Sequence, residues 1–597
     1  MKYVFILAIT FFSLLVSHFS PLSAKTKEIH LKWVHTSDVH GSLFGYDYLR
    51  KREVSGGLSS IYAYTQELKR QYGDRLVLTD GGDCLQGQPT AYYYNFVDTL
   101  SPHLVAEAMN AMGYDCGAMG NHDVETGHAV YDRWVRQCQF PVLGANVIDT
   151  RTGEPYLRPY LIIKRAGVKI AILGMLTPGI PNWLPEQLWS GLRFDDMVES
   201  ARKWVKVIQK REHPDLLVGL FHSGYDGGIV NDVDGRQVHE NATKLVAEQV
   251  TGFDLICYGH DHQAAVNRLQ NPRGEEVVVM GPTSQGKRIA EADIVLSLDR
   301  RGRVVRKQIT ANVPFVGGSK GDVRGEQDDV RSFESRFSQQ RQTLKEWVDQ
   351  PIGRLTKSIY ERDAFFGPSD FIDLIHQMQL DLTGADVSFA APLSFDSRLQ
   401  AGTIRVSDMF ALYKYENFLY TMLLTGREIK DFLEMSYGLW TNQMNGPDDH
   451  IMLLDSILDN GRRQGLKNLS YNMDSAAGIC YVVDVSKPEG QRVVIESMAD
   501  GSPFDLDREY KVAINSYRGN GGGELLTRGA GIPHSELKKR IINSTEQDLR
   551  FYLMKRVMEQ GTIEPKKLNQ WRFVPDEWAP AALERDRKIL FPNSRMQ

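Results

Sequence analysis

The sequence has few cysteines, little net charge and no internal repeat, and each shortage excludes a class of protein. Its 597 residues include five cysteines, an odd number without a CxxC pair, so the spacing specifies no disulfide framework. The net charge is −5 with both signs mixed along the chain, and no basic stripe for gripping a nucleic-acid duplex is evident. No GxGxxG follows a predicted strand, which disfavours a dinucleotide-binding loop. We therefore expect a small-molecule substrate and no nucleic-acid polymer.

Only one long apolar run is present, and it lies at the start of the chain. Lys2 precedes a largely apolar run at 3–16, and a polar, Pro-containing stretch then ends at Ala24. This order of charged, apolar and small residues is typical of a secretory signal peptide. We predict a signal peptide over 1–24 and an exported protein, periplasmic or secreted, without a membrane span after cleavage. The alternative is an uncleaved membrane anchor, for which the run is short.

The length and the hydrophobic pattern indicate two domains of unequal size. From residue 29 to about 313, short β-rich runs alternate with amphipathic segments, which indicates a layered α/β architecture. Apolar residues recur at helical spacing from Val330 to Val348 and predict a connecting helix that ends before Pro351. The predicted parts after the signal peptide are an N-terminal domain at 29–316, a linker and connecting helix at 317–351, a C-terminal α/β domain at 352–575 and a tail at 576–597.

Six runs of the first region are predicted to be buried strands, and short polar clusters lie at the ends of several of them. The strands are at 31–36, 76–79, 168–173, 216–221, 255–258 and 277–280. In the second region, helices are predicted near 370–382 and 426–440, and strands at 479–485, 492–495 and 511–515.

Five polar clusters of the first region offer carboxylate, imidazole and amide ligands. They are Ser37-Asp38-Val39-His40-Gly41, Asp80-Gly81-Gly82-Asp83, Gly120-Asn121-His122-Asp123, Phe221-His222-Ser223-Gly224 and Gly259-His260-Asp261-His262. Such oxygen and nitrogen donors suit divalent zinc, manganese, iron or cobalt. Two metals close together can hold one phosphate and supply a hydroxide nucleophile at neutral pH. Each cluster alone is weak evidence, but all five together predict a two-metal phosphoesterase.

The motif order DxH, GD, GNHD, H and GHxH resembles the calcineurin-like metallophosphoesterase family over about residues 31–290. The resemblance implies a four-layer α/β/β/α sandwich and two divalent metal ions (Zn, Mn, Co or Fe). In the implied ligand set, Asp38, His40 and His262 bind the first metal, Asp83 bridges, and Asn121, His222 and His260 complete the second. His122 is the implied catalytic imidazole. Glu125 stands where the nucleotidase branch of the family has an orienting Asp, and it is a longer carboxylate.

The second region resembles the substrate-binding C-terminal domain of bacterial 5'-nucleotidases. The resemblance rests on Tyr413-Lys414-Tyr415-Glu416-Asn417, Leu424-Thr425-Gly426, Asn515-Ser516-Tyr517-Arg518 and Gly521-Gly522-Gly523. It implies that Tyr415 and Tyr517 sandwich the nucleobase, since an aromatic face accepts any base by stacking. Arg518 is a candidate contact for a phosphate or a sugar; the alternative is a solvated surface arginine.

The Ala390-Ala391-Pro392-Leu393-Ser394 form favours one branch of this family. The 5'-nucleotidases often carry there a motif that ends in Arg, which this chain lacks. We therefore predict a 2',3'-cyclic-nucleotide 2'-phosphodiesterase/3'-nucleotidase in which metal-bound hydroxide attacks phosphorus and the domains close about a hinge near 352–355. The alternatives are a 5'-nucleotidase or UDP-sugar hydrolase with the same metals, or a binding protein without turnover. The intact ligand set disfavours the last.

Overall fold

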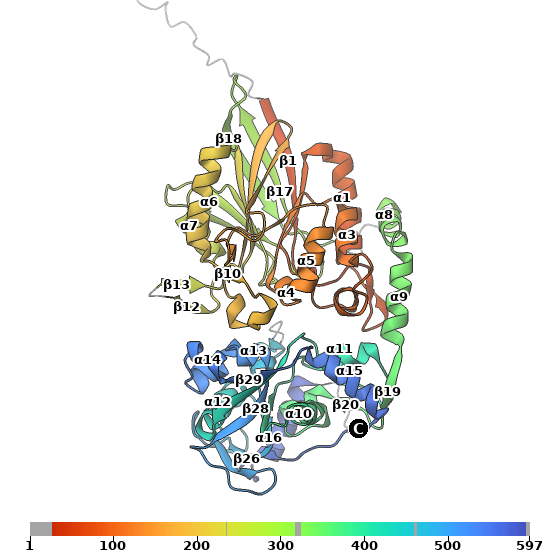
Figure 1. The fold of residues 1–597 in the computed structure, drawn as a ribbon, viewed down its shortest axis with the longest axis vertical. Helices are drawn as coiled ribbons and strands as arrows, with labels where there is room; N and C mark the ends of the chain where they lie inside the picture. Colours follow the sequence, from red (N-terminus) through yellow and green to blue (C-terminus); the bar gives the residue numbers. More distant parts are fainter. Residues whose placement is uncertain (1–26, 234–235, 317–323, 459–462, 593–597) are drawn as a thin grey trace, which may run out of the picture.

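The structure is a computed structural model that describes residues 27–233, 236–316, 324–458 and 463–592. The predicted signal peptide at 1–24 and residues 317–323 of the predicted linker and connecting helix lie outside these residues. No helix of the described part combines the length and apolar composition needed to cross a bilayer. Figure 1 shows an N-terminal domain above a C-terminal domain, with α8 (Arg324–Ser335) and α9 (Ser338–Asp349) along one side.

Two six-stranded sheets form the centre of the N-terminal domain, with the orders β18-β17-β1-β4-β5-β6 and β15-β16-β14-β11-β9-β8. Each contains four neighbouring parallel strands with antiparallel strands outside them. The first sheet comprises β1 (Lys27–Thr36), β4 (Leu76–Asp80), β5 (Cys116–Ala118), β6 (Val142–Leu143), β17 (Ala290–Leu298) and β18 (Val304–Asn312). The second comprises β8 (Tyr160–Arg165), β9 (Val168–Leu176), β11 (Leu216–His222), β14 (Leu255–Tyr258), β15 (Ala265–Gln270) and β16 (Glu276–Gly281).

The sheets and their helices make four layers. Trp33 of β1 and Val218 of β11 belong to one buried apolar cluster between the two sheets. Separate clusters join the outer face of the first sheet to α1 (Gly57–Tyr72), α3 (Leu104–Met112) and α5 (His128–Gln137), and that of the second to α6 (Met197–Glu212) and α7 (Thr243–Gln249). The α/β/β/α sandwich is therefore confirmed, and the six predicted strands all form.

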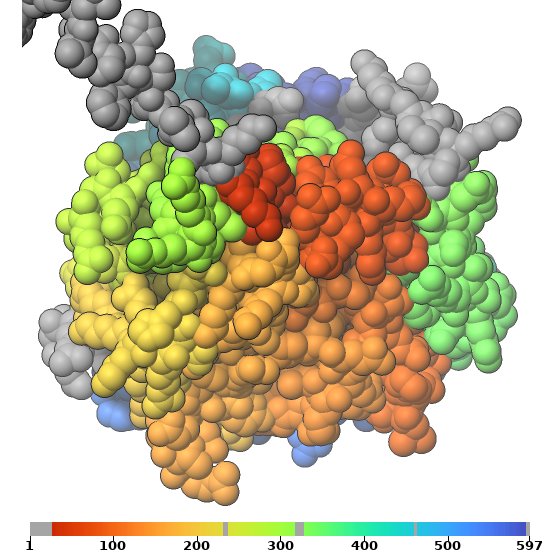
Figure 2. Space-filling model, turned by 90° about the horizontal axis from the view of Figure 1, so that it is seen from above, coloured from red at the N-terminus to blue at the C-terminus, as the bar shows by residue number. Residues whose placement is uncertain are grey.

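The connection between the domains differs from the single helix that the spacing predicts. It consists of two helices, because α8 ends at Ser335 and α9 begins at Ser338. Phe333 and Phe337 stay buried across the break, and the Phe333 ring lies 4.9 Å from that of Tyr62 in α1. Figure 2 shows the pair, in green, packed along the flank of the N-terminal domain. The second helix ends before Pro351, as predicted.

The C-terminal domain is built on a five-stranded sheet of order β25-β21-β28-β24-β29 and two three-stranded sheets, β27-β26-β31 and β23-β19-β30. The first comprises β21 (Val387–Ala390), β24 (Leu419–Thr425), β25 (Ser475–Ala477), β28 (Glu509–Asn515) and β29 (Ile541–Ser544). The others comprise β19 (Pro351–Leu355), β23 (Gly402–Arg405), β26 (Ile479–Asp484), β27 (Val493–Met498), β30 (Thr562–Ile563) and β31 (Trp571–Val574). The main helices are α10 (Asp370–Thr383), α11 (Val406–Leu412), α12 (Gly426–Trp440), α14 (His534–Arg540) and α15 (Leu549–Gln560).

A local sequence signal explains where α12 begins. The Thr425 hydroxyl accepts a hydrogen bond from the Glu428 N–H, and the Glu428 carboxylate accepts one from the Thr425 N–H, so a capping box starts α12.

Residues 576–597, predicted as a tail, contain α16 (Ala579–Leu590). The buried Asp586 of α16 accepts hydrogen bonds from the N–H groups of Ile451 and Met452, which holds the segment against the domain.

Candidate metal centre

The predicted ligands lie at the carboxyl ends of parallel strands from both sheets. Asp38 and His40 follow β1, Asp83 follows β4 and Asn121 follows β5, while His222 ends β11 and His260 and His262 follow β14. Parallel strands end at one edge of a sheet, and polar loops there are where α/β folds place their ligands. The packing of the two sheets brings both edges together at the end of the domain that faces the C-terminal domain (Figure 1).

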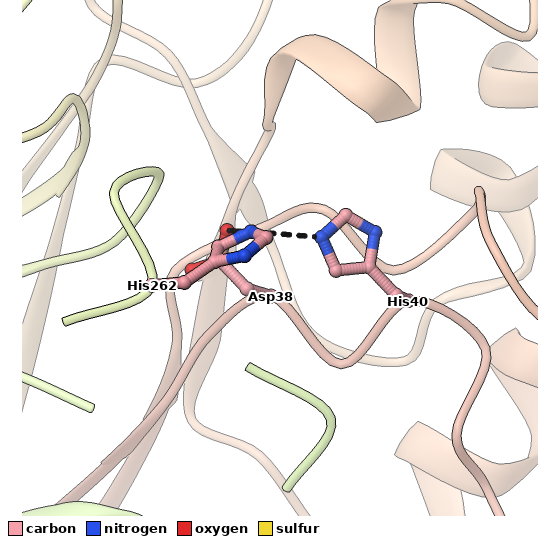
Figure 3. Close-up of side chains that lie close together, drawn as sticks. All are labelled: Asp38, His40 and His262. Carbon is pink, nitrogen blue, oxygen red and sulfur yellow. Dashed lines mark hydrogen bonds and ion pairs between the residues drawn. The ribbon is translucent and has the colours of Figure 1, made fainter. Parts of the chain in front are cut away.

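Three of the predicted ligands form a first group. Asp38, His40 and His262 offer donor atoms that all lie within 4.8 Å of one another. The Nε2 atoms of His40 and His262 are 3.1 Å apart, and His262 Nε2 lies 3.2 Å from Asp38 Oδ1 (Figure 3). Donors at metal–ligand distances of about 2.0–2.1 Å around a tetrahedral ion are separated by about 3.3 Å. The group therefore fits one divalent ion.

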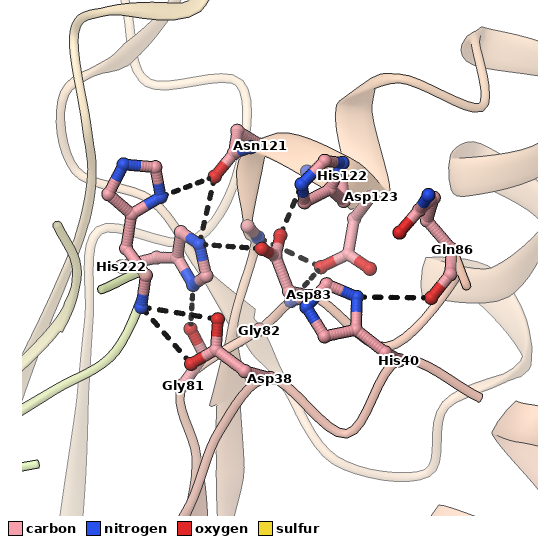
Figure 4. A network of polar contacts seen from close by, with 12 residues as sticks. Asp38, His40, Gly81, Gly82, Asp83, Gln86, Asn121, His122, Asp123 and His222 are labelled. Atoms are coloured by element: carbon pink, nitrogen blue, oxygen red, sulfur yellow. Dashed lines mark hydrogen bonds and ion pairs between the residues drawn. The ribbon is translucent and has the colours of Figure 1, made fainter. Parts of the chain in front are cut away.

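The other four form a second group. Asp83, His222 and His260 offer donors within 4.8 Å of one another. The amide oxygen of Asn121 lies 3.0 Å from His222 Nε2, which lies 3.1 Å from Asp83 Oδ2 (Figure 4). The same amide oxygen lies 2.8 Å from His260 Nδ1. Asp83 Oδ2 is buried, and apart from its ion pair with His222 it accepts no hydrogen bond among the described residues. A buried carboxylate is costly unless cations or hydrogen bonds satisfy its oxygens, so this donor set also fits a divalent ion.

Asp38 and His40 of the first group are held in the protonation states that bind metals. Burial lowers the pKa of His40 to about 4, so its imidazole remains neutral. Burial opposes ionisation of Asp38, but the hydrogen bond and charge of His262 keep the Asp38 pKa well below its ordinary value. A carboxylate and a neutral imidazole are the forms in which these side chains bind metals.

The backbone at the site adopts φ angles that are rare for residues other than glycine. Five of the seven predicted ligands have a positive φ: 55° at Asp38, 50° at His40, 59° at Asp83, 86° at His260 and 60° at His262. This region costs non-glycine residues of order 1–3 kcal/mol each and persists only where the surroundings impose it. The carboxylate of Asp123 contributes, since it accepts hydrogen bonds from the N–H groups of Asp83, Cys84, Leu85 and Gly120.

His122 and Glu125 lie next to the second group. The Nδ1 atom of His122 is 2.5 Å from Glu125 Oε2, and the His122 N–H donates to Asp83 Oδ1 at 2.8 Å. Burial favours the neutral imidazole, but the charges of Asp83 and Glu125 outweigh it and raise the His122 pKa to about 10. The longer Glu125 side chain thus reaches the imidazole as the sequence prediction requires.

Both predicted stacking residues belong to the C-terminal domain. Tyr415 and Tyr517 are half-buried, and burial together with the charges of Glu240 and Tyr415 raises the Tyr517 pKa to about 12, against the opposing effect of Arg518. Glu240 in turn lies 3.2 Å from His260 Nε2. Asn520, three residues after Tyr517, donates to the Trp183 carbonyl of the N-terminal domain at 3.1 Å, so the segment that carries Tyr517 lies at the domain interface.

Arg518 does not occupy the predicted position of a substrate contact. Its side chain is 1% exposed, and its guanidinium donates to Asp474 Oδ2 at 2.8 and 3.0 Å, to the Gly522 carbonyl at 2.9 Å and to the Tyr471 carbonyl. Its donors are thus committed to an internal ion pair and to the loop that follows Tyr517. The structure corrects the sequence interpretation: Arg518 holds this loop and does not reach a phosphate or sugar.

Two segments of the chain match two known domain families. Residues 31–264 match the calcineurin-like phosphoesterase family, and residues 351–528 match the 5'-nucleotidase C-terminal domain. The chain combines these two domains. Calcineurin-like phosphoesterases use divalent metals, so the chain is a metal-dependent phosphoesterase, and the predictions of family and enzyme class are confirmed.

Curated relatives extend over most of the chain. The trifunctional nucleotide phosphoesterase protein YfkN of Bacillus subtilis is 28% identical over 92% of this chain, which spans only 39% of that relative's length. The 2',3'-cyclic-nucleotide 2'-phosphodiesterase/3'-nucleotidases of Yersinia enterocolitica and Salmonella typhimurium are 24% and 25% identical over 92% and 95% of the chain, and over 89% and 92% of their own lengths.

Solved structures share the two-domain fold. A candidate 5'-nucleotidase from Staphylococcus aureus, in complex with alpha-ketoglutarate, matches 91% of this chain and all of its own, with a TM-score of 0.72 at 20% identity. A 5'-nucleotidase precursor from Thermus thermophilus matches 92% of this chain and all of its own with a TM-score of 0.59, also at 20% identity. These likenesses support the architecture of this phosphoesterase.

One supporting residue of the phosphoesterase site escaped the sequence interpretation. Glu240 follows β13 (Arg236–His239) and places Oε1 3.2 Å from His260 Nε2, while its Oε2 accepts the Ile229 N–H at 2.7 Å. A carboxylate on the second nitrogen of a ligating histidine fixes its tautomer and orientation. Glu240 stands outside the five motif clusters and twenty residues from its partner, so no local pattern marks it.

We expect Glu240→Gln to weaken metal binding. Loss of such a partner costs about 10–100-fold in metal affinity, because the amide no longer favours the tautomer with hydrogen on His260 Nε2. Titration of metal-free protein with Mn²⁺ or Zn²⁺ measures the change. Glu212→Gln is the control, since Glu212 pairs with Lys169 instead. Unchanged affinity in Glu240→Gln would show that His260 needs no such support.

Proposed function

We propose that the protein is an exported two-metal nucleotide phosphohydrolase of the 2',3'-cyclic-nucleotide 2'-phosphodiesterase/3'-nucleotidase type. The observation that carries this proposal is the convergence of seven ligand side chains with the His122–Glu125 pair. The sequence of residues 1–24 supports export. The Ala-Pro-Leu-Ser segment at 391–394 and the names of the Yersinia and Salmonella relatives support the cyclic-nucleotide branch.

One divalent ion would be held by Asp38, His40 and His262 and the other by Asn121, His222 and His260, with Asp83 as the proposed shared ligand. Two such ions would neutralise the phosphate charge and supply a hydroxide at neutral pH. The chain's own residues then position the substrate. Tyr415 and Tyr517 hold the base between them, so the ribose and its phosphate extend toward the ligand groups. Stacking is tolerant of base identity, and we expect weak base selectivity.

His122 acts on the leaving ribose oxygen. Glu125 accepts the hydrogen on His122 Nδ1, which fixes the tautomer and leaves Nε2 to face the substrate. From there the imidazole stabilises charge on the phosphoryl group or donates a proton to the leaving oxygen. A metal ion bound to Asp83 would offset the negative charge of that carboxylate. Glu125 would then be the main group that keeps the His122 pKa raised.

The substrate lies between two domains, so closure is part of the proposal. The base contacts come from the C-terminal domain and the phosphate contacts from the N-terminal domain. Rotation about a hinge near 352–355, where β19 follows α9, would open and close the site.

Phosphate release from 2',3'-cyclic AMP, 3'-AMP, 5'-AMP and UDP-glucose, with and without chelator, tests the function. We expect the first two to be turned over, with loss of all activity on metal removal. Preference for 5'-AMP or UDP-glucose would instead assign a 5'-nucleotidase or a UDP-sugar hydrolase with the same metal centre.

We expect Tyr517→Ala to raise KM for 3'-AMP by about tenfold, since stacking of one base on an aromatic ring is worth ~1–3 kcal/mol. The kcat should change less, because the ring does not touch the phosphate. Steady-state kinetics with Tyr360→Ala as the control, another half-buried tyrosine on β20 (Ile359–Tyr360), measures this. An unchanged KM would place the base elsewhere.

A further inference from the structure

Trp183 is an aromatic side chain beside the second metal group that the proposed mechanism leaves without a role. It follows η3 (Ile180–Asn182), the turn that leads out of β9. Its ring centroid lies 5.6 Å from that of His260, with 30° between the planes. The side chain is half-buried, so part of the indole remains exposed. It therefore borders the place where the phosphate would bind.

The backbone makes room for this ring. A Cβ on Gly179 would lie 2.7 Å from the ring carbon Cη2 of Trp183, closer than such atoms approach. The absence of a side chain at Gly179 thus lets the indole pack closely against the turn. Trp189 in the same loop is also half-buried, but its indole N–H donates to the Leu184 carbonyl and its ring contacts Phe194. Trp183 is the one of the two that turns toward the metal ligands.

Trp183 also lies where the two domains meet. Asn520 of the C-terminal domain donates from Nδ2 to the Trp183 carbonyl at 3.1 Å and to the Tyr420 hydroxyl at 3.3 Å. Asn520 closes α13 (Ser516–Gly519), the short helix that carries Tyr517. An ion pair between Glu186 and Lys538 joins the same loop to α14. Trp183 is consequently tied to the element that presents one of the two base-stacking residues.

We propose that Trp183 is a specificity-determining residue that packs against the sugar of the substrate. This rests on the proposed nucleotide function and deepens it. The position lies between His260, on the phosphate side, and the helix of Tyr517, on the base side, and the sugar is the part of a nucleotide that joins the two. An indole face is apolar and carries negative partial charge, so it suits the C–H face of a furanose ring and does not suit a phosphate.

The test compares Trp183→Leu with Trp189→Leu on two substrates. Leucine keeps an apolar side chain and removes the flat surface. The substrates are 3'-AMP and glycerol 2-phosphate, a phosphate ester without a sugar ring. We expect Trp183→Leu to raise KM for 3'-AMP about fivefold or more. The metal content should stay unchanged, and KM for glycerol 2-phosphate should change little. Trp183→Phe should restore most of the affinity, and Trp189→Leu should leave both KM values near wild type.

Three results would overturn the proposal. One is an unchanged KM for 3'-AMP in Trp183→Leu. The second is an equal rise for both substrates, which would assign Trp183 to the metal centre through His260. The third is loss of bound metal in Trp183→Leu. If the wild-type protein hydrolyses glycerol 2-phosphate and no nucleotide, the nucleotide function itself fails, and this outcome is separate from the other three because it appears without any variant.

Discussion

His122→Ala is expected to lower kcat by about 10²–10⁴-fold, the usual contribution of a positioned proton donor or acceptor, while the bound metal stays constant. The reason lies in the contacts of the side chain. His122 binds Glu125 through Nδ1, its backbone N–H donates to the proposed ligand Asp83, and its ring meets that of His40 edge to face with the centroids 5.4 Å apart. Removing the imidazole therefore breaks no hydrogen bond between His122 and the seven proposed ligands. Steady-state kinetics with 3'-AMP and metal analysis of the same sample measure the two quantities.

A second histidine provides a matched control. His128 pairs with Asp132 at 3.3 Å and is similarly exposed, but its Nε2 contacts the Ser190 carbonyl away from the ligand groups. His128→Ala should keep wild-type kcat. If His122→Ala loses metal in proportion to activity, His122 is a ligand and the assignment of the proton-transfer role is wrong.

The strands and ligand positions of the N-terminal domain could be predicted because both depend on local sequence. Runs such as 216–221 are apolar throughout, which is typical of strands buried on both faces. The polar residues directly after such strands must then meet at the carboxyl edge of the sheet. The GNHD cluster lacked this support, because β5 has three residues and is too short to show any period.

The break between α8 and α9 was hidden from the sequence for a related reason. Phe333 and Phe337 are four residues apart and both buried, so the helical spacing continues across the interruption. Apolar spacing reports which side chains face the core, and it does not require an unbroken hydrogen-bonded backbone between them.

Partners distant in the chain account for the remaining errors. The position of Arg518 next to Tyr517 suggests a substrate contact, but its guanidinium forms a buried ion pair with Asp474, 44 residues earlier. A buried arginine needs a paired carboxylate, and the sequence contains too many candidate carboxylates to identify which one. Glu240 and Trp183 were missed in the same way, since only the fold places each of them beside His260.

Gly120→Ala is the second substitution expected to lower activity strongly, because Gly120 also contacts a residue distant in the chain. A Cβ at Gly120 would lie 2.1 Å from Asp83 Oδ1 and 2.4 Å from the Asp83 backbone nitrogen. Gly120 has φ −103° and ψ 170°, which alanine adopts freely, so the substitution acts through space alone. The Asp83 carboxylate or the loop must move by roughly 1 Å, and such a misplacement can cost about 10²-fold in rate.

We expect Gly120→Ala to fold, to lose about 10²-fold or more in kcat/KM, and to bind less metal, since Asp83 is the proposed bridging ligand. Gly446→Ala is the control, because a Cβ there meets nothing within 4 Å. Full activity in Gly120→Ala would mean that Asp83 tolerates displacement, and the proposed bridge between the two metals would then be wrong. A loss of metal and activity together, with unchanged thermal stability, would identify the close approach of Gly120 and Asp83 as the contact that positions the bridging carboxylate.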